Sequence, residues 1–137
     1  RPTKDKTAEF FEVCKSLADY VFLDCTSSLD DPLSVYGMAA ADKAVQLITP
    51  DIRSAAYYAS FEKTYEQIKS KSIGVINITD KDLYLPVGEV KSGFSNAKYI
   101  LPYSMYLKQQ YITGELTHKI PDQKFSAVCR GIAGAVL

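Results

Sequence analysis

Apolar side chains recur at steps of three and four residues along this chain, and this spacing constrains the fold more than any other feature of the sequence. One such stripe runs through residues 7–23, at Phe10, Val13, Cys14, Leu17 and Val21. A second stripe follows the Pro121-Asp122 pair, at Phe125, Val128, Cys129, Ile132 and Val136. A step of three to four residues places side chains on one face of a helix. The pattern therefore predicts two amphipathic helices, with Cys14 and Cys129 on their apolar faces.

Three further segments carry helical signals. Residues 34–49 favour a central helix, because only Asp42, Lys43 and Gln46 interrupt the apolar residues between Ser34 and Thr49. The Thr49-Pro50-Asp51 sequence predicts a helix start, because a hydroxyl can cap the first turn and proline fits the first helical position. We expect this helix to reach about residue 70, and another to begin near Pro102 and end at Gly114.

The helical spacing breaks down between residues 72 and 95. Residues 73–78 and 83–87 have the composition of short strands, and turn residues lie between them. Pro86 and Gly88 indicate that such a hairpin lies at an edge. A chain of 137 residues is long enough for one hydrophobic core. We therefore predict a single mainly α domain over residues 1–137, with about five helices and a short β-hairpin-like arm at about 72–95.

Residues 20–46 and 111–137 resemble each other without a gap. Five of the aligned pairs are identical, among them Tyr20/Tyr111 and Thr26/Thr117. Both segments start near an expected helix end, cross a turn and enter an apolar helix. The similarity therefore suggests a duplicated helix-turn-helix unit, and internal repeats are typical of scaffold proteins.

The charge balance argues against nucleic acid as a partner. Sixteen basic and sixteen acidic residues leave no net charge, so no overall field attracts a phosphate backbone. The longest apolar run, residues 35–41, is much shorter than the roughly 20 residues of a transmembrane helix. A small net charge also favours association. We therefore expect the partners to be other protein subunits of a large complex, and Arg1 at the start suggests a processed mature form or a fragment.

Residues for catalysis or metal binding are scarce. His118 is the single histidine and is expected in a polar turn, which favours a surface residue over a catalytic one. The three cysteines lack the Cys-x-x-Cys spacing of zinc sites, and the acidic residues near Asp30 lack the spacing of a calcium loop. We therefore predict a non-catalytic structural subunit. The alternative is a small-molecule-binding protein, or an enzyme that uses His118 and a cysteine.

The cysteines support a more specific hypothesis. A thiol can form a thioether with an unsaturated cofactor side chain, and a linear tetrapyrrole also needs a carboxylate for its pyrrole N–H groups and a cation for its propionates. Cys25 follows Asp24, Cys129 precedes Arg130, and Cys14 has charged neighbours. Cys25 is the most accessible cysteine by position. Cys14 and Cys129 can equally serve as small hydrophobic residues of helix cores.

These features resemble the chromophore-bearing rod linkers, or γ subunits, of red-algal phycobilisomes. The resemblance rests on the segments Phe10–Lys15, Leu23–Thr26 and Ala127–Gly131, on the many tyrosines and on the internal similarity. It implies a linker subunit that carries covalently bound bilin for light harvesting, at the stromal face of the chloroplast thylakoid. The residues that the resemblance assigns are the candidate attachment sites Cys14, Cys25 and Cys129 and the candidate bilin contacts Asp24 and Arg130.

Overall fold

The structure is a computed structural model that describes residues 3–28, 30–82, 85–94, 96–115 and 119–137. The tertiary contacts divide the chain into two compact units, Arg1–Ala44 and Val45–Leu137. We call them the N-terminal unit and the C-terminal unit. Each unit has its own internal packing.

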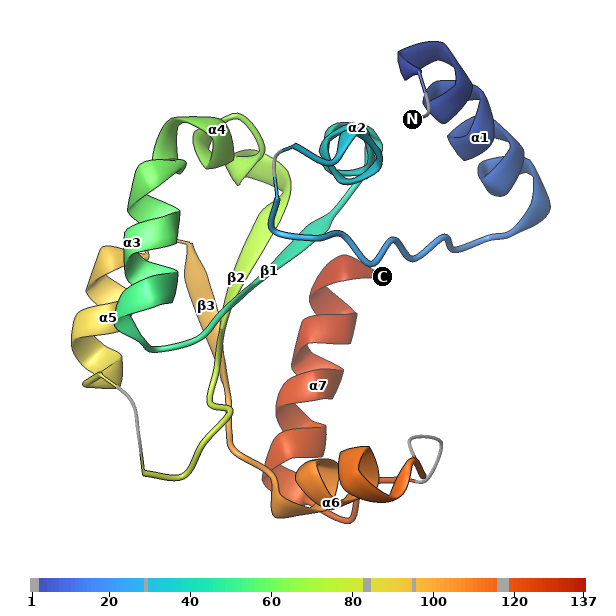
Figure 1. The fold of residues 1–137 in the computed structure, drawn as a ribbon. Coiled ribbons are helices and arrows are strands. Elements are labelled where there is room, and N and C mark those ends of the chain that lie inside the picture. Colours follow the sequence, from blue (N-terminus) through green and yellow to red (C-terminus); the bar gives the residue numbers. More distant parts are fainter. Residues whose placement is uncertain (1–2, 29, 83–84, 95, 116–118) are drawn as a thin grey trace. The chain divides into compact units, whose positions relative to one another are not determined.

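The N-terminal unit consists of helix α1 (Lys4–Leu17), an irregular segment and helix α2 (Pro32–Ala40) (Figure 1). Helix α2 begins at this point because the Asp31 carboxylate accepts a hydrogen bond of 2.9 Å from the Ser34 N–H. The two helices approach closely at Gly37, where an added methyl group would lie 3.5 Å from the ring of Phe11. Phe11 is buried accordingly.

The C-terminal unit alternates strands and helices. A β-α-β-α-β order places two crossover connections before the last two helices. The elements are β1 (Ala44–Ile48), α3 (Ile52–Ser60), α4 (Glu62–Glu66), a 3-10 turn (Lys69–Lys71), β2 (Ser72–Asn77), α5 (Val87–Gly93), β3 (Ala97–Leu101), α6 (Met105–Thr113) and α7 (Gln123–Val136).

In the part of the chain that the structure describes, the sheet is parallel and has three strands in the order β1-β2-β3. The central strand β2 is buried along most of its length, and Val75 and Ile76 have no exposed surface. Strands covered on both faces lack the alternation of apolar and polar residues that marks a half-exposed strand. The continuous apolar composition of β2 therefore fits its central position.

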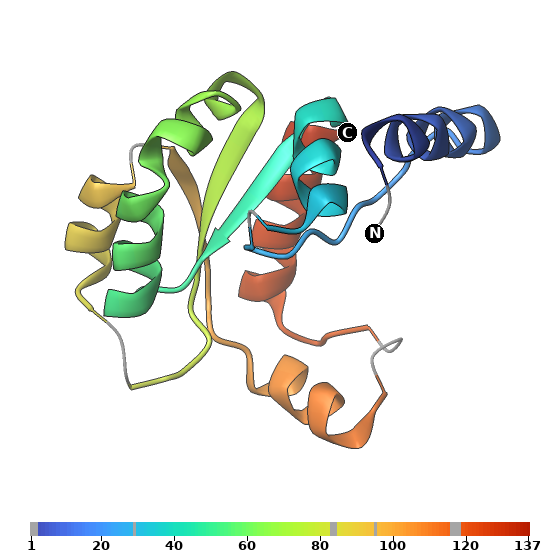
Figure 2. The same cartoon turned by 45° about the horizontal axis from the view of Figure 1, so that its top comes forward.

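Helices cover the sheet on two sides (Figures 1 and 2). Helices α3 and α5 lie on one face and α7 lies on the other, where it packs against β3. The core between the sheet and the first pair of helices contains Ile48, Ile76, Val90 and Phe94. On the α7 side, the Tyr99 hydroxyl donates a hydrogen bond of 3.0 Å to the Gly131 carbonyl. The unit is therefore a three-layer α/β arrangement.

Strand β2 requires glycine at position 74. A methyl group there would lie 2.7 Å from the carbonyl oxygen of Asn96 and 2.9 Å from the amide nitrogen of Ala97. The register shifts between Gly74 and Val75, which face Ala97 and Tyr99 respectively. The bulge and the missing side chain together let the start of β3 approach β2.

The prediction of a mainly α fold is wrong, because the described chain contains a parallel sheet enclosed by helices and is mixed α/β. The β-hairpin-like arm at 72–95 is wrong as well, since the first of its strands is the central strand β2. Residues 87–93, which the prediction placed in the same arm, form helix α5. Residues 83–84, in the second expected strand, lie outside the described residues.

Two expected helices are shorter than predicted. The helix over 34–49 ends at Ala40, and the residues after Asp42 and Lys43 form strand β1. A short apolar segment can form either a helix or a strand, and here its pairing with β2 selects the strand. The helix over 7–23 ends at Leu17. The helix after Thr49 divides at Phe61, whose carbonyl accepts the first bonds of α4.

The predicted helix-turn-helix duplication is wrong. Residues 20–22 are irregular, whereas their counterparts at 111–113 complete helix α6. The first segment ends in strand β1 and the second ends in helix α7. The two helices that were expected in the second segment are confirmed. Helix α6 stops at Gly114, which has a left-handed φ of 75°, and Asp122 caps α7.

Candidate functional site

The predicted cysteine sites fall into different units. Cys14 on α1 and Cys25 in the irregular segment belong to the N-terminal unit, together with Asp24. Cys129 and Arg130 lie on α7 in the C-terminal unit. All three cysteines are half-buried free thiols.

The thiols of Cys25 and Cys129 are less reactive than an exposed cysteine. Burial raises the pKa of Cys25 more than the hydrogen bond with Ser34 lowers it, and the charges of Asp24 and Asp31 raise it further. Burial also raises the pKa of Cys129. Because the thiolate is the nucleophile, both side chains are weak nucleophiles at neutral pH.

The remaining sequence candidates give no catalytic or metal site among the described residues. No group of three or more His, Cys, Asp or Glu side chains in that part of the chain is arranged to hold a metal ion. Asp31 caps helix α2, as its position in a connector predicts. His118, and Thr117 beside it, lie outside the described residues.

The geometry of the C-terminal unit directs attention to one edge of the sheet, which sequence analysis missed. We call it the carboxyl edge: the turns that follow the three parallel strands, at residues 49–51, 78–80 and 102–104, with the start of α7 at Asp122. Figure 1 shows the three strands running toward this edge. Parallel strands bring their carboxyl ends together, so turns far apart in sequence become neighbours.

Two backbone hydrogen bonds hold the turns at the carboxyl edge in place. The Ile78 N–H donates to the Leu101 carbonyl at 2.9 Å, which extends the pairing of β2 and β3 past the end of β2. The Leu85 N–H donates to the Pro50 carbonyl at 2.7 Å and ties the connection before α5 to the end of β1. The edge is thus built on paired backbone.

Thr49, Asp51 and Ser54 form a hydrogen-bonded cluster where β1 ends and α3 begins. The Thr49 hydroxyl donates to the Asp51 carboxylate and lies 2.6 Å from the Ser54 hydroxyl. The Ser54 N–H donates to the other carboxylate oxygen at 2.9 Å. The Thr49 hydroxyl and the Ser54 amide lower the pKa of Asp51. Asp51 is therefore ionised at neutral pH and caps the helix.

A second capped helix starts at the same edge. Asp122 accepts a hydrogen bond of 3.0 Å from the Phe125 N–H at the start of α7. This amide lowers the pKa of Asp122, and the charge of Lys124 lowers it further. Ser104, which follows β3, is buried. The carboxyl edge therefore combines ionised carboxylates with hydroxyl groups, and Asn77, the last residue of β2, directly precedes it.

One sequence signal could have revealed this edge. Residues 44–48, 72–77 and 97–101 are short apolar or alternating segments, and helical segments of suitable length lie between them. Strands that alternate with helices indicate a parallel sheet. Once the sheet is recognised, the polar residues after each strand form one site.

Comparisons with known proteins give no relative for this chain. No protein-family model matches the sequence, and neither a curated protein nor a solved structure is significantly similar to it. Within the described residues, every helix is too short or too polar to cross a membrane. Any function must therefore be argued from the chain's own residues.

Proposed function

We propose that the C-terminal unit is a ligand-binding α/β module that holds a small organic molecule at the carboxyl edge of its sheet. The observation that carries the proposal is the meeting of three polar turns at this edge, after β1, β2 and β3. Open parallel sheets characteristically bind ligands outside the carboxyl ends of their strands. This support is an analogy of fold class, and the side chains at the edge supply the chemistry.

The side chains at the carboxyl edge favour a ligand that donates hydrogen bonds. Asp51 and Asp122 are ionised, and both already accept hydrogen bonds from the amide groups at the starts of α3 and α7. A phosphate would have to displace these carboxylates and would meet their negative charge. A neutral or cationic molecule with N–H or O–H groups can instead bond to the Asp, Thr and Asn oxygens.

An NMR titration tests this proposal. Neutral and cationic heteroaromatic fragments are added to the ¹⁵N-labelled chain, and the amides of Thr49, Asn77 and Ser104 are expected to shift together. Asn77→Ala should weaken the bound fragment at least tenfold, whereas Lys98→Ala, an exposed residue of β3, should not. Shifts confined to other parts of the unit, or an unchanged affinity in Asn77→Ala, would overturn the proposal.

Helix α6 supports a second proposal, that the chain is a non-catalytic subunit of a larger assembly. Large apolar side chains stay exposed along this short helix, at Met105, Tyr106, Leu107, Tyr111 and Ile112. Tyr111 is 78% exposed and Ile112 is 73% exposed. Large apolar side chains that stay exposed in this number on one short helix are typical of a surface that binds another protein. A partner subunit that covers α6 would remove them from water.

Site-specific photo-crosslinking tests the subunit proposal. A photoreactive amino acid replaces Ile112 on α6, and a matched one replaces the exposed Lys63 on α4. Covalent adducts to another protein are expected at position 112 and not at position 63, in the cells that make the protein. The same adducts at both positions would contradict a specific role for α6.

The phycobilisome version of this proposal adds bilin at Cys14, Cys25 or Cys129, with Asp24 and Arg130 as contacts and a chloroplast location. It requires activation of thiols whose pKa is raised at Cys25 and Cys129, so an attaching enzyme would have to supply that activation. An intact mass larger than the sequence mass by one pigment, with a visible absorption band that survives denaturation, would support it. A colourless protein of the sequence mass would refute it.

A further inference from the structure

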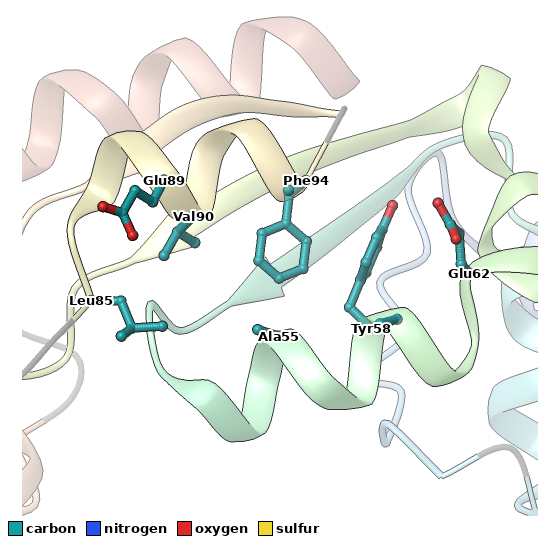
Figure 3. A pocket seen from close by; sticks show the side chains of 9 residues that line it. Ala55, Tyr58, Glu62, Leu85, Glu89, Val90 and Phe94 are labelled. Carbon is teal, nitrogen blue, oxygen red and sulfur yellow. The ribbon is translucent and has the colours of Figure 1, made fainter.

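A cavity of about 280 Å³ lies between helices α3 and α5, and its lining differs from the residues proposed to bind a ligand at the carboxyl edge (Figure 3). Both helices supply its walls, and Leu85 closes one end. The lining residues are Ala55, Tyr58, Ala59, Glu62, Leu85, Glu89, Val90, Gly93 and Phe94. All of them belong to the C-terminal unit.

The floor of this cavity is the hydrophobic core itself. Val90 is 6% exposed and Phe94 is 3% exposed, and Ala55 and Tyr58 pack against the same cluster. The rings of Tyr58 and Phe94 meet edge to face at a centroid distance of 4.5 Å. The floor is therefore apolar, aromatic and held by packing, so a ligand ring could be buried on it without rearranging the core.

The charged residues of the lining are both acidic. In Figure 3, Glu89 lies at the end near Leu85, and Glu62 lies at the opposite end beside Tyr58. At the Glu62 end, Lys69 is close enough for Glu62 to raise its pKa, and it forms an ion pair of 2.7 Å with Glu66. Glu89 belongs to neither ion pair found among the described residues. The Glu89 carboxylate is therefore the stronger attractor for a cation.

We propose that this cavity binds a small aromatic amine, with the ring on Phe94 and Tyr58 and the ammonium group on Glu89. A cavity of about 150 Å³ holds a benzene-sized molecule, so 280 Å³ accommodates one ring and a short alkyl chain. A charge-assisted hydrogen bond to the carboxylate fixes the ammonium group.

The size of the cavity distinguishes this ligand from the lysine side chain of a partner protein. A lysine offers the same ammonium group on a thin aliphatic stem, which leaves most of the aromatic floor uncovered. An aromatic amine covers the floor and reaches the carboxylate at once. The matched probes below separate these two sources of the cation.

Calorimetry or NMR on the full chain tests the inference with three probes of similar shape. 2-Phenylethylamine should bind with shifts at Tyr58, Val90 and Phe94, 2-phenylethanol should bind at least tenfold more weakly, and 3-phenylpropionate should not bind. Nα-acetyl-lysine methylamide should bind more weakly than the aromatic amine. Tighter binding of the lysine probe would overturn the inference in favour of a protein partner, and equal binding of the carboxylate would overturn it outright.

Two variants complete the test. Glu89→Gln should reduce the affinity for 2-phenylethylamine about tenfold and leave that for 2-phenylethanol unchanged, since a charged hydrogen bond is lost. Gly93→Leu should abolish binding of both, because position 93 has open space beside it that the new side chain fills. Glu9→Gln, at an exposed residue of α1, is the matched control. Unchanged amine binding in Glu89→Gln, in a variant whose spectrum shows the native fold, would refute the inference.

Discussion

Replacing Gly74 by alanine is the sharpest test of the parallel sheet, because the structure leaves no room for a side chain there. The new Cβ atom would lie 2.7 Å from the Asn96 carbonyl oxygen, whereas ordinary contacts begin at 3.4 Å. The obstacle is backbone, so no rotamer change relieves it. The Asn96–Ala97 segment, or strand β2 itself, must move apart by more than half an ångström.

The cost of Gly74→Ala follows from two losses. Overpacking in a dense interior costs about 1–3 kcal/mol, and the hydrogen bond of 2.8 Å from the Gly74 N–H to Asn96 contributes about 1 kcal/mol. Alanine gains about 0.4–1 kcal/mol by restricting the unfolded chain. We therefore expect Gly74→Ala to lower the free energy of unfolding by about 1–3.5 kcal/mol.

A second glycine provides the control. Gly134 lies inside helix α7 and has nothing within 4 Å of an added methyl group, so Gly134→Ala should stabilise the protein by about 1 kcal/mol. Urea unfolding followed by far-UV circular dichroism measures both variants. A Gly74→Ala variant as stable as the wild type would show that β3 does not start against β2 as described.

Three further predictions concern the cap of α3, the packing of α7 and the reactivity of two cysteines. Asp51→Ala should cost about 1 kcal/mol through loss of the α3 cap, and Asp51→Asn should cost less. The folded-state pKa of Asp51 and of Asp122 is lowered. Their contribution to stability is therefore present above the unfolded pKa of about 3.9 and is lost as the pH falls through the folded pKa. The stability of the Asp51→Asn variant should thus fall less steeply in acid than that of the wild type, and identical curves would contradict this. Phe125→Ala, at a buried position of α7, should cost about 3–5 kcal/mol in urea unfolding, and a loss below about 1 kcal/mol would show that α7 does not pack on the sheet. Cys25 and Cys129 should react with iodoacetamide more slowly in the folded protein than in urea, because burial raises their pKa; equal rates in mass spectrometry would refute it.

Local signals predicted the end of α6 and the start of α7, because the groups that decide these two boundaries are close in sequence. Asp122 lies three residues from the amide whose hydrogen bond it accepts, and Gly114 ends α6 through its own left-handed φ angle. Such features depend on propensity and capping alone. The helices around residues 105–113 and 123–136 therefore follow from the sequence.

The sheet could not be predicted in the same way, since its strands are defined by distant partners. Residues 44–48 form a strand because β2 lies beside them, about 28 positions later in the chain. Ala97, Tyr99 and Leu101 do alternate with the exposed Lys98 and Ile100, and this period of two was overlooked. The carboxyl edge could not be predicted without the sheet, because its residues come together only when the strands are parallel.

The two proposals for the C-terminal unit meet at Ser104. This buried residue follows β3 at the carboxyl edge and occupies the N-cap position of α6, and its hydroxyl oxygen has no hydrogen-bond partner among the described residues. A ligand that forms a hydrogen bond with this hydroxyl would contact the residue at which α6 begins, and α6 carries the exposed apolar residues. Ligand and partner subunit should therefore influence each other through reciprocal linkage. A fragment that shifts the Ser104 amide is expected to change the yield of crosslinks from position 112, and a constant yield at saturating fragment would show that the edge and α6 act independently.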